Sequence, residues 1–169
     1  MTERHEQIVA RLLEQYRQQP EIVVINLFGS MAKGGVHPDS DIDMELISKT
    51  AEEWLLVKKE IDGITVDLCI CPLEHFHHQV SNYPYLCYDY LTEKVLYDPH
   101  GIFAKAHAEL ANYFTSNPEV VMYWETKLTE MREKKRAGTH KMADIVAAYD
   151  IAELRFSIDG KISRNFLRG

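Results

Sequence analysis

The chain has 169 residues, of which 46% are hydrophobic and 27% are charged; this composition excludes a disordered chain and fits one domain, or a small domain with a helical extension. The formal net charge of −7 argues against DNA or RNA as the main partner, because proteins that hold nucleic acid usually present a basic face, and it is more compatible with cationic or neutral small substrates. No apolar signal segment or membrane-spanning run is present, and the three cysteines are an odd number best interpreted as reduced thiols, so we expect a cytoplasmic protein without a membrane partner.

The first elements alternate between helix and strand. Apolar residues at helical spacing predict an amphipathic helix over residues 3–18. Residues 22–28 are an almost continuous apolar run rich in β-branched side chains, which indicates a buried strand. That run stops at Gly29-Ser30, where we expect a short helix to begin. Residues 41–47 then alternate between acidic and apolar side chains, which predicts a half-buried strand with one carboxylate face.

The middle of the chain contains a further alternating segment. Residues 51–60 are predicted to form a helix, followed by a turn at Asp62-Gly63. Residues 64–70 alternate again and predict a third strand. Beyond it we expect a short strand at residues 94–97, and helices near residues 72–80, 84–91 and 102–114.

The last third of the chain is predicted to be helical. Asn117-Pro118 is a typical helix start. Two apolar stripes separated by Gly138 predict two long helices, the second of which ends near Asp159-Gly160. These stripes need to be covered by each other, by the sheet or by a second subunit, and we expect a homodimer. The whole pattern predicts an α+β fold: a small mixed sheet flanked by helices over residues 1–116, then a helical region over residues 117–169.

Three groups of residues in this pattern are candidates for chemistry. Gly29-Ser30 ends a buried strand, where a glycine lets the backbone approach a ligand closely and a helix N-terminus suits phosphate. Asp41 and Asp43 share one side of a strand, so they repel each other unless a cation lies between them, and Mg²⁺ prefers such oxygens. Asp67 lies mid-strand among apolar residues, where an unpaired carboxylate is costly to bury. A metal shared with the other two aspartates would supply its partner.

Each of these features also has a simpler interpretation. Gly-Ser is a common turn, an Asp-x-Asp pair is often a solvated edge, and Asp67 can be paired for structural reasons. Glu45 lies on the same predicted strand face as the two aspartates, and we expect a structural or supporting role for it. Asp67 is the first candidate for a general base, with Glu93 and Asp89 as weaker ones.

The combination of these residues resembles a known family. The stretches Phe28-Gly29-Ser30-Met31-Ala32-Lys33-Gly34 and Ser40-Asp41-Ile42-Asp43-Met44, with Asp67 on a later strand, resemble the signature of the DNA polymerase β-like nucleotidyltransferase superfamily. The resemblance covers residues 20–100 and is closest to the bacterial aminoglycoside and lincosamide nucleotidyltransferase branch.

The resemblance implies a role for each matching residue. Gly29 and Ser30 would bind the β- and γ-phosphates of a nucleotide, with Lys33 and Ser40 as further nucleotide-binding residues. Many relatives have an arginine where this chain has Lys33, and a lysine keeps the charge but not the bidentate fork. The catalytic and metal-binding set would be Asp41, Asp43 and Asp67, which hold two Mg²⁺ ions.

The implied activity is a Mg²⁺-dependent transfer of a nucleoside monophosphate onto a hydroxyl of a small acceptor. The donor would be ATP or another nucleoside triphosphate. AMP would be the group that is transferred, and pyrophosphate would leave. An aminoglycoside-like antibiotic is one class of acceptor. Two alternatives stay open. The acceptor can be a protein, as in antitoxin nucleotidyltransferases that adenylylate a partner, or the chain can be a nucleotide-binding module without turnover. The complete set of three carboxylates argues against the last.

Overall fold

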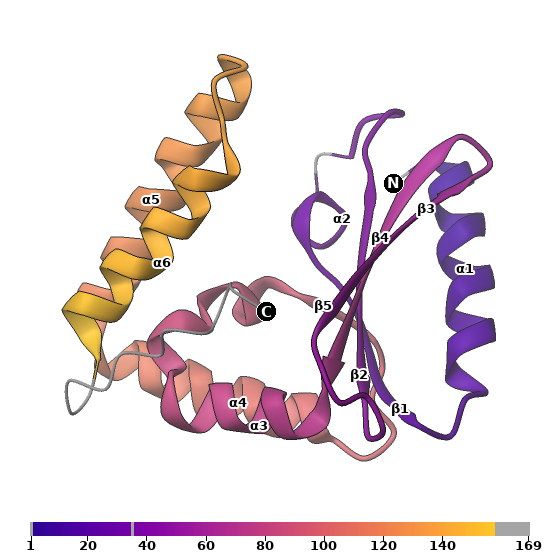
Figure 1. Ribbon diagram of the computed structural model, residues 1–169, viewed down its shortest axis with the longest axis horizontal. Helices are drawn as coiled ribbons and strands as arrows, with labels where there is room; N and C mark the ends of the chain where they lie inside the picture. Colours follow the sequence, from indigo (N-terminus) through magenta and orange to yellow (C-terminus); the bar gives the residue numbers. More distant parts are fainter. Residues whose placement is uncertain (1, 35, 158–169) are drawn as a thin grey trace. The chain divides into compact units, whose positions relative to one another are not determined.

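The computed structural model describes residues 2–34 and 36–157 (Figure 1). Contacts divide the chain into two compact units, Met1–His78 with Asp89–Ala108, and Gln79–Tyr88 with Glu109–Gly169. A mixed five-stranded sheet, flanking helices and C-terminal helices confirm the expected α+β class. The functional boundary at residue 116 stays a prediction.

The first unit is built around the sheet, whose strand order is β3-β4-β2-β1-β5. Strands β2 and β4 pair in parallel, and the pairings of β1 with β2, β1 with β5 and β3 with β4 are antiparallel. Its elements are α1 (Glu3–Arg17), β1 (Ile22–Leu27), α2 (Gly29–Lys33), β2 (Ile42–Ser48), β3 (Leu55–Ile61), β4 (Ile64–Pro72) and β5 (Lys94–Tyr97).

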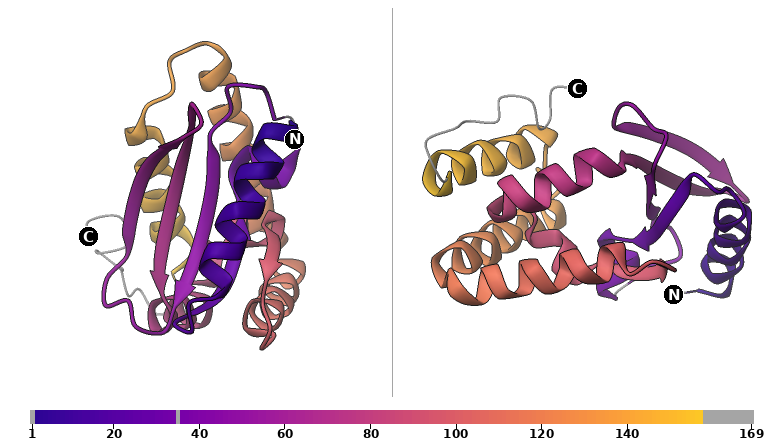
Figure 2. Two further views of the ribbon diagram at one scale, coloured as in Figure 1. Left: turned by 90° about the vertical axis from the view of Figure 1, so that its right-hand side faces the viewer. Right: turned by 90° about the horizontal axis from the view of Figure 1, so that it is seen from below.

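Helix α1 lies along one face of this sheet, as the two figures agree (Figures 1 and 2). Its apolar stripe packs on the strands in one buried cluster, which includes Ile8, Leu12, Leu27, Met44 and Leu68. Because side chains alternate between the faces of a strand, the residues between these apolar ones point to the opposite face. That opposite face therefore carries the acidic side chains predicted for β2 and β4.

The predicted helix over residues 51–60 is wrong, because Leu55–Ile61 form strand β3. The turn that follows explains the difference. Asp62 and Gly63 have φ angles of 52° and 72°, and a two-residue turn with positive φ at both positions joins antiparallel strands. Ile61 accordingly pairs with Ile64 across the turn. The leucines, lysines and glutamate of β3 favour a helix intrinsically, but the hairpin overrides that preference.

Four helical elements lie between strand β4 and the last two helices. They are α3 (Leu73–Asn82), two short 3₁₀ helices η1 (Pro84–Leu86) and η2 (Tyr88–Thr92), and α4 (Ile102–Ser116). The single helix predicted over residues 84–91 is therefore wrong: hydrogen bonds from Leu86 to Tyr83 and from Cys87 to Pro84 span three residues, not four.

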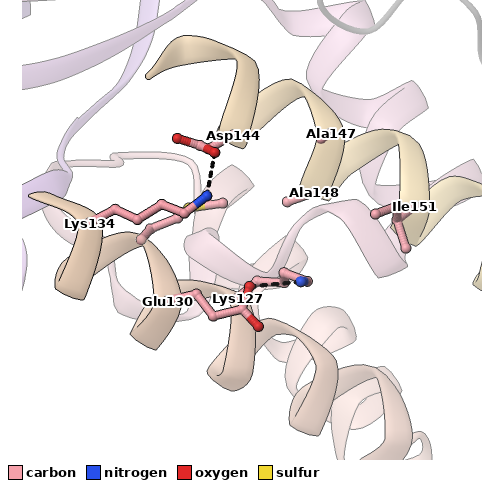
Figure 3. A pocket seen from close by; sticks show the side chains of 8 residues that line it. Lys127, Glu130, Lys134, Asp144, Ala147, Ala148 and Ile151 are labelled. Carbon is pink, nitrogen blue, oxygen red and sulfur yellow. Dashed lines mark hydrogen bonds and ion pairs between the residues drawn. The ribbon is translucent and has the colours of Figure 1, made fainter. Parts of the chain in front are cut away.

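The second unit contains the helical hairpin of α5 (Pro118–Arg136) and α6 (Met142–Phe156), which confirms the two helices predicted there. The Tyr123 hydroxyl of α5 donates to the Ala148 carbonyl of α6 at 2.5 Å. Figure 3 shows side chains that line a pocket between the two helices, among them Lys134 and Asp144, which form an ion pair of 2.5 Å. The predicted end near Asp159-Gly160 lies outside the described residues, and the homodimer stays a prediction. No described helix combines the length and apolar character needed to cross a lipid bilayer.

Candidate active site

The three predicted aspartates converge at one end of the acidic sheet face. Asp43 on β2 lies directly beside Asp67 on β4, because these parallel strands pair in that register. Asp41 is exposed and precedes the first residue of β2, while Asp43 is half-buried. Asp43 and Asp67 therefore lie on neighbouring strands, and Asp41 lies two residues before Asp43.

An ammonium group lies among these carboxylates. Lys58 on β3 is opposite Asp67 in the hairpin register, and its Nζ lies 2.9 Å from Asp67 Oδ2. The hydrogen bond and the charge of Asp67 raise the pKa of Lys58, and the charges of Asp41 and Asp43 raise it further. The negative charges of all three aspartates thus act on the Lys58 ammonium. This part of the sheet therefore favours a bound positive charge.

The other oxygen of Asp67, Oδ1, is buried and has no hydrogen-bond partner among the described residues. A buried carboxylate oxygen without a partner carries a desolvation cost that a cation would offset. Among the described residues, no group of three carboxylate, histidine or thiol side chains is arranged to hold a metal ion. The positive charge next to Asp67 is that of Lys58. The donor chemistry nevertheless fits Mg²⁺, which needs only one or two carboxylates besides phosphate oxygens and water.

Gly29 lies against this group of carboxylates. Its φ is +60°, and a Cβ added to it would fall 2.2 Å from Asp43 Oδ2. The neighbouring Phe28 amide donates to the Asp43 carbonyl at 3.1 Å, which holds the turn on β2. Only glycine combines this backbone conformation with so close an approach. The turn therefore brings a bare backbone segment directly to Asp43.

The two other residues predicted in this loop lie on α2, the short helix that was expected to begin at Gly29. Ser30 is half-buried in its first turn, and Lys33, its last residue, pairs with Asp89 at 3.0 Å. Because α2 has five residues, the helix dipole contributes less than in a long helix. Nucleotide binding by Ser30 and Lys33 stays a prediction.

Ser40 is engaged in the loop that leads into β2. Its hydroxyl accepts a hydrogen bond from the His37 amide at 2.9 Å, and its carbonyl oxygen lies 2.9 Å from His5 Nε2. His5 is fully buried, and its Nδ1 lies 2.5 Å from the Thr2 hydroxyl oxygen. This histidine ties the start of α1 to the residue before Asp41. Sequence reasoning missed it, since a histidine in the first turn of an amphipathic helix has no distinguishing pattern.

A second acidic group lies further along the same sheet face. Asn26 on β1 pairs across from Glu45 on β2, and its Nδ2 donates to Glu93 Oε2 at 3.0 Å. Burial raises the pKa of Glu45 to about 7. Burial, followed by the charge of Glu45, raises the pKa of Glu93 well above its usual range. The supporting role expected for Glu45 stays a prediction, and its partnership with Asn26 was missed, although a lone asparagine within the apolar run of β1 was the available signal.

Replacing Lys58 with methionine tests whether this ammonium stands in for a metal ion. We expect the melting temperature without Mg²⁺ to fall, because the three carboxylates lose their counter-charge. We also expect the apparent Mg²⁺ affinity to tighten by about two- to fivefold, since a competing exposed cation is removed. Thermal unfolding at increasing Mg²⁺ concentrations measures both effects. Lys59→Met is the matched control, because Lys59 contacts Tyr16; an equal Mg²⁺ response in both variants would contradict the expectation.

The fold and the site together define a class of protein. A glycine-serine turn after the first strand and aspartates on two adjoining strands of a mixed sheet resemble the arrangement of a nucleotidyltransferase domain. The chain belongs to the polymerase beta nucleotidyltransferase family, whose model matches residues 10–100. The superfamily predicted from the sequence motifs is thereby confirmed.

A solved structure is similar in fold. The nucleotidyltransferase-like protein from Exiguobacterium sibiricum 255-15 superposes with a TM-score of 0.50 at 13% sequence identity over 88% of this chain. The chain spans 53% of that protein's length, so the likeness concerns the fold alone. No curated protein matches the chain in sequence.

Proposed function

We propose that this protein is a Mg²⁺-dependent nucleotidyltransferase that moves AMP from ATP onto a hydroxyl of a small acceptor. One observation carries the proposal. Asp43 and Asp67 lie side by side in the parallel register of β2 and β4, and Asp67 Oδ1 is buried without a hydrogen-bond partner among the described residues. Members of the family generally use divalent metals and nucleoside triphosphates, and these carboxylates provide the oxygen donors for such a metal.

The proposed roles are those that the family resemblance implies, and the positions of the residues are compatible with them. Asp41, Asp43 and Asp67 would hold two Mg²⁺ ions, which when bound neutralise the charge of the triphosphate and of the leaving pyrophosphate. The bare backbone at Gly29 admits a phosphate close to Asp43, and the Ser30 hydroxyl donates to it.

Two further residues complete the proposed site. Lys33 adds a positive charge once it exchanges Asp89 for phosphate, and Ser40 orients the loop before Asp41 through its contacts with His37 and His5. Asp67 is also the first candidate for the base that accepts the acceptor's hydroxyl proton.

The acceptor class follows from resemblance and charge. The motifs around Gly29-Ser30 and Asp41-x-Asp43 are close to those of the antibiotic-modifying branch, and the net charge of −7 favours a cationic or neutral small molecule over nucleic acid. We therefore propose an aminoglycoside-like acceptor first and a protein acceptor second.

A single assay tests this function. The protein is incubated with ATP, Mg²⁺ and a panel of aminoglycosides, and pyrophosphate release is measured alongside thermal stabilisation by Mg²⁺-ATP alone. We expect stabilisation by Mg²⁺-ATP and pyrophosphate release with at least one acceptor; label from [α-³²P]ATP on a co-purified protein would instead favour the protein acceptor. If Mg²⁺-ATP does not stabilise the chain and Asp41→Ala behaves like the wild type, the proposal is wrong.

A further inference from the structure

The group of Asn26, Glu45 and Glu93, hereafter the acidic cluster, contains unsatisfied polar atoms. Asn26 is fully buried, and Glu45 is 6% exposed. Asn26 Oδ1 and Glu45 Oε2 are both buried without a hydrogen-bond partner among the described residues. Buried polar atoms in folded proteins usually have a hydrogen-bond partner, so these two acceptor oxygens beside the Glu93 carboxylate require an explanation.

The donors already present satisfy this cluster only in part. The Asn26 amide nitrogen donates to Glu93, and Asn26 and Tyr90 are both hydrogen-bond partners of Glu45, with the Tyr90 hydroxyl 3.5 Å from Oε1. The positive charge that acts on Glu93 is that of Lys33, which is itself paired with Asp89. In the described part of the chain no basic side chain forms an ion pair with Glu45 or Glu93. The described residues therefore leave room for a further donor at this cluster.

We propose that the acidic cluster binds an ammonium group of the acceptor substrate, through Asn26 Oδ1 and the carboxylates of Glu45 and Glu93. This inference rests on the proposed function and specifies the acceptor for that site. An ammonium carries three donors and one positive charge, which matches the two orphaned acceptor oxygens and the acidic character of the cluster. Glu93 is only partly buried, so it lies on the side from which a ligand can approach.

The surroundings favour an organic cation over a metal ion. Tyr90, which contacts Glu45, also packs edge-on against Phe76 and Phe103 with ring centroids 5.5 Å and 5.6 Å away. Aromatic rings beside a charged site stabilise alkylammonium groups, whereas Mg²⁺ retains water molecules that aromatic surfaces do not hydrogen-bond well.

The position of the cluster limits the shape of the acceptor. Glu45 follows Asp43 by two residues on β2 and shares its face, and such residues lie about 7 Å apart along a strand. An ammonium at Glu45 would therefore lie a few bonds from a hydroxyl placed at the aspartates. The acceptor class is an amino alcohol, such as an amino sugar, in which the attacking hydroxyl and an amine are separated by a few carbon atoms.

Binding of a matched pair of compounds tests the proposal. Kanamycin carries several amines, and its fully N-acetylated derivative keeps the hydroxyls but loses the positive charges. Isothermal titration calorimetry of the full chain measures both compounds without nucleotide. The informative variants are Glu93→Gln and Glu45→Gln, which preserve size and remove charge. Glu60→Gln, an exposed position on β3, controls for the overall negative charge.

We expect kanamycin to bind the wild type and the Glu60→Gln variant alike, and at least tenfold more weakly to Glu93→Gln, because a buried acidic partner is lost. The N-acetylated compound should bind at least tenfold more weakly than kanamycin. The proposal would be overturned if the wild type bound kanamycin and its N-acetylated derivative equally, or if Glu93→Gln and Glu45→Gln both bound kanamycin as the wild type does. Either result would indicate that the two carboxyl groups only share a proton with each other. Thermal unfolding of each variant establishes that it is folded.

Failure of the proposed function is distinguishable from failure of this inference. Mg²⁺-ATP binding, measured without acceptor, reports the proposed function independently. A chain that binds Mg²⁺-ATP but shows no preference for the charged compound retains its proposed function and lacks the ammonium site.

Discussion

Replacement of Asp67 by asparagine is expected to reduce nucleotidyl transfer by about three orders of magnitude, because loss of the proposed metal-binding carboxylate would remove several kcal/mol of transition-state stabilisation. The substitution preserves the size of the side chain in a strand whose neighbours Val66 and Leu68 are buried. We therefore expect the melting temperature without Mg²⁺ to change little, because the substitution removes one of three neighbouring carboxylate charges together with a partly exposed ion pair to Lys58.

Pyrophosphate release and Mg²⁺-ATP binding measure the effect of Asp67→Asn. Asp62→Asn is the matched control: it makes the same chemical change on the same hairpin, at a turn residue with φ of 52°, a conformation that asparagine tolerates. Wild-type transfer by Asp67→Asn, or an equal loss in Asp62→Asn, would show that Asp67 is not a metal ligand.

Gly29→Ala is expected to impair both folding and activity. An alanine held at φ of +60° costs about 1–3 kcal/mol, and its Cβ would lie 2.2 Å from Asp43 Oδ2. Either the turn or the aspartate must move, so we expect a lower melting temperature and a loss of transfer of at least about 100-fold, since small displacements of catalytic groups have effects of that size.

Gly101→Ala separates the two causes. Gly101 has a φ of +66°, but nothing lies within 4 Å of an added Cβ, so this variant incurs the backbone strain alone. Circular dichroism melts and the transfer assay compare the pair. If Gly29→Ala loses no more activity than Gly101→Ala, the contact with Asp43 is not important for the site.

Much of the sheet was predictable because its strands have clear patterns. The apolar run of β1 reflects burial on both of its faces, and the alternation of β2 and β4 reflects a more buried face and a more polar one. Sequence periodicity predicts strands through such burial. Strand β3 lacked such a signal. It is an edge strand with mostly exposed side chains, so its sequence of helix-favouring residues was not contradicted by any periodicity.

The arrangement of the carboxylates was only partly predictable. The motif spacing placed Asp41, Asp43 and Asp67 in one candidate site, but the parallel register that sets Asp43 beside Asp67 depends on strand order, which is non-local. The same holds for Lys58, which was predicted on a helix, and for Asn26 and Glu93, which are far apart in the sequence and meet across the sheet. Contacts of this kind depend on topology, which local propensities do not specify.

The turn at Asp62-Gly63 also bears on the order in which the molecule assembles. The β3–β4 hairpin is local in sequence, whereas the pairing of β4 with β2 spans a longer stretch of chain, and local contacts form first in folding. We therefore expect Asp67 to meet Asp43 with the Lys58 ammonium already beside it, which would reduce the mutual repulsion of the aspartates as β4 pairs with β2. We expect refolding rates in EDTA and in Mg²⁺ to be similar, because the hairpin brings its own counter-ion to the step at which the site is formed.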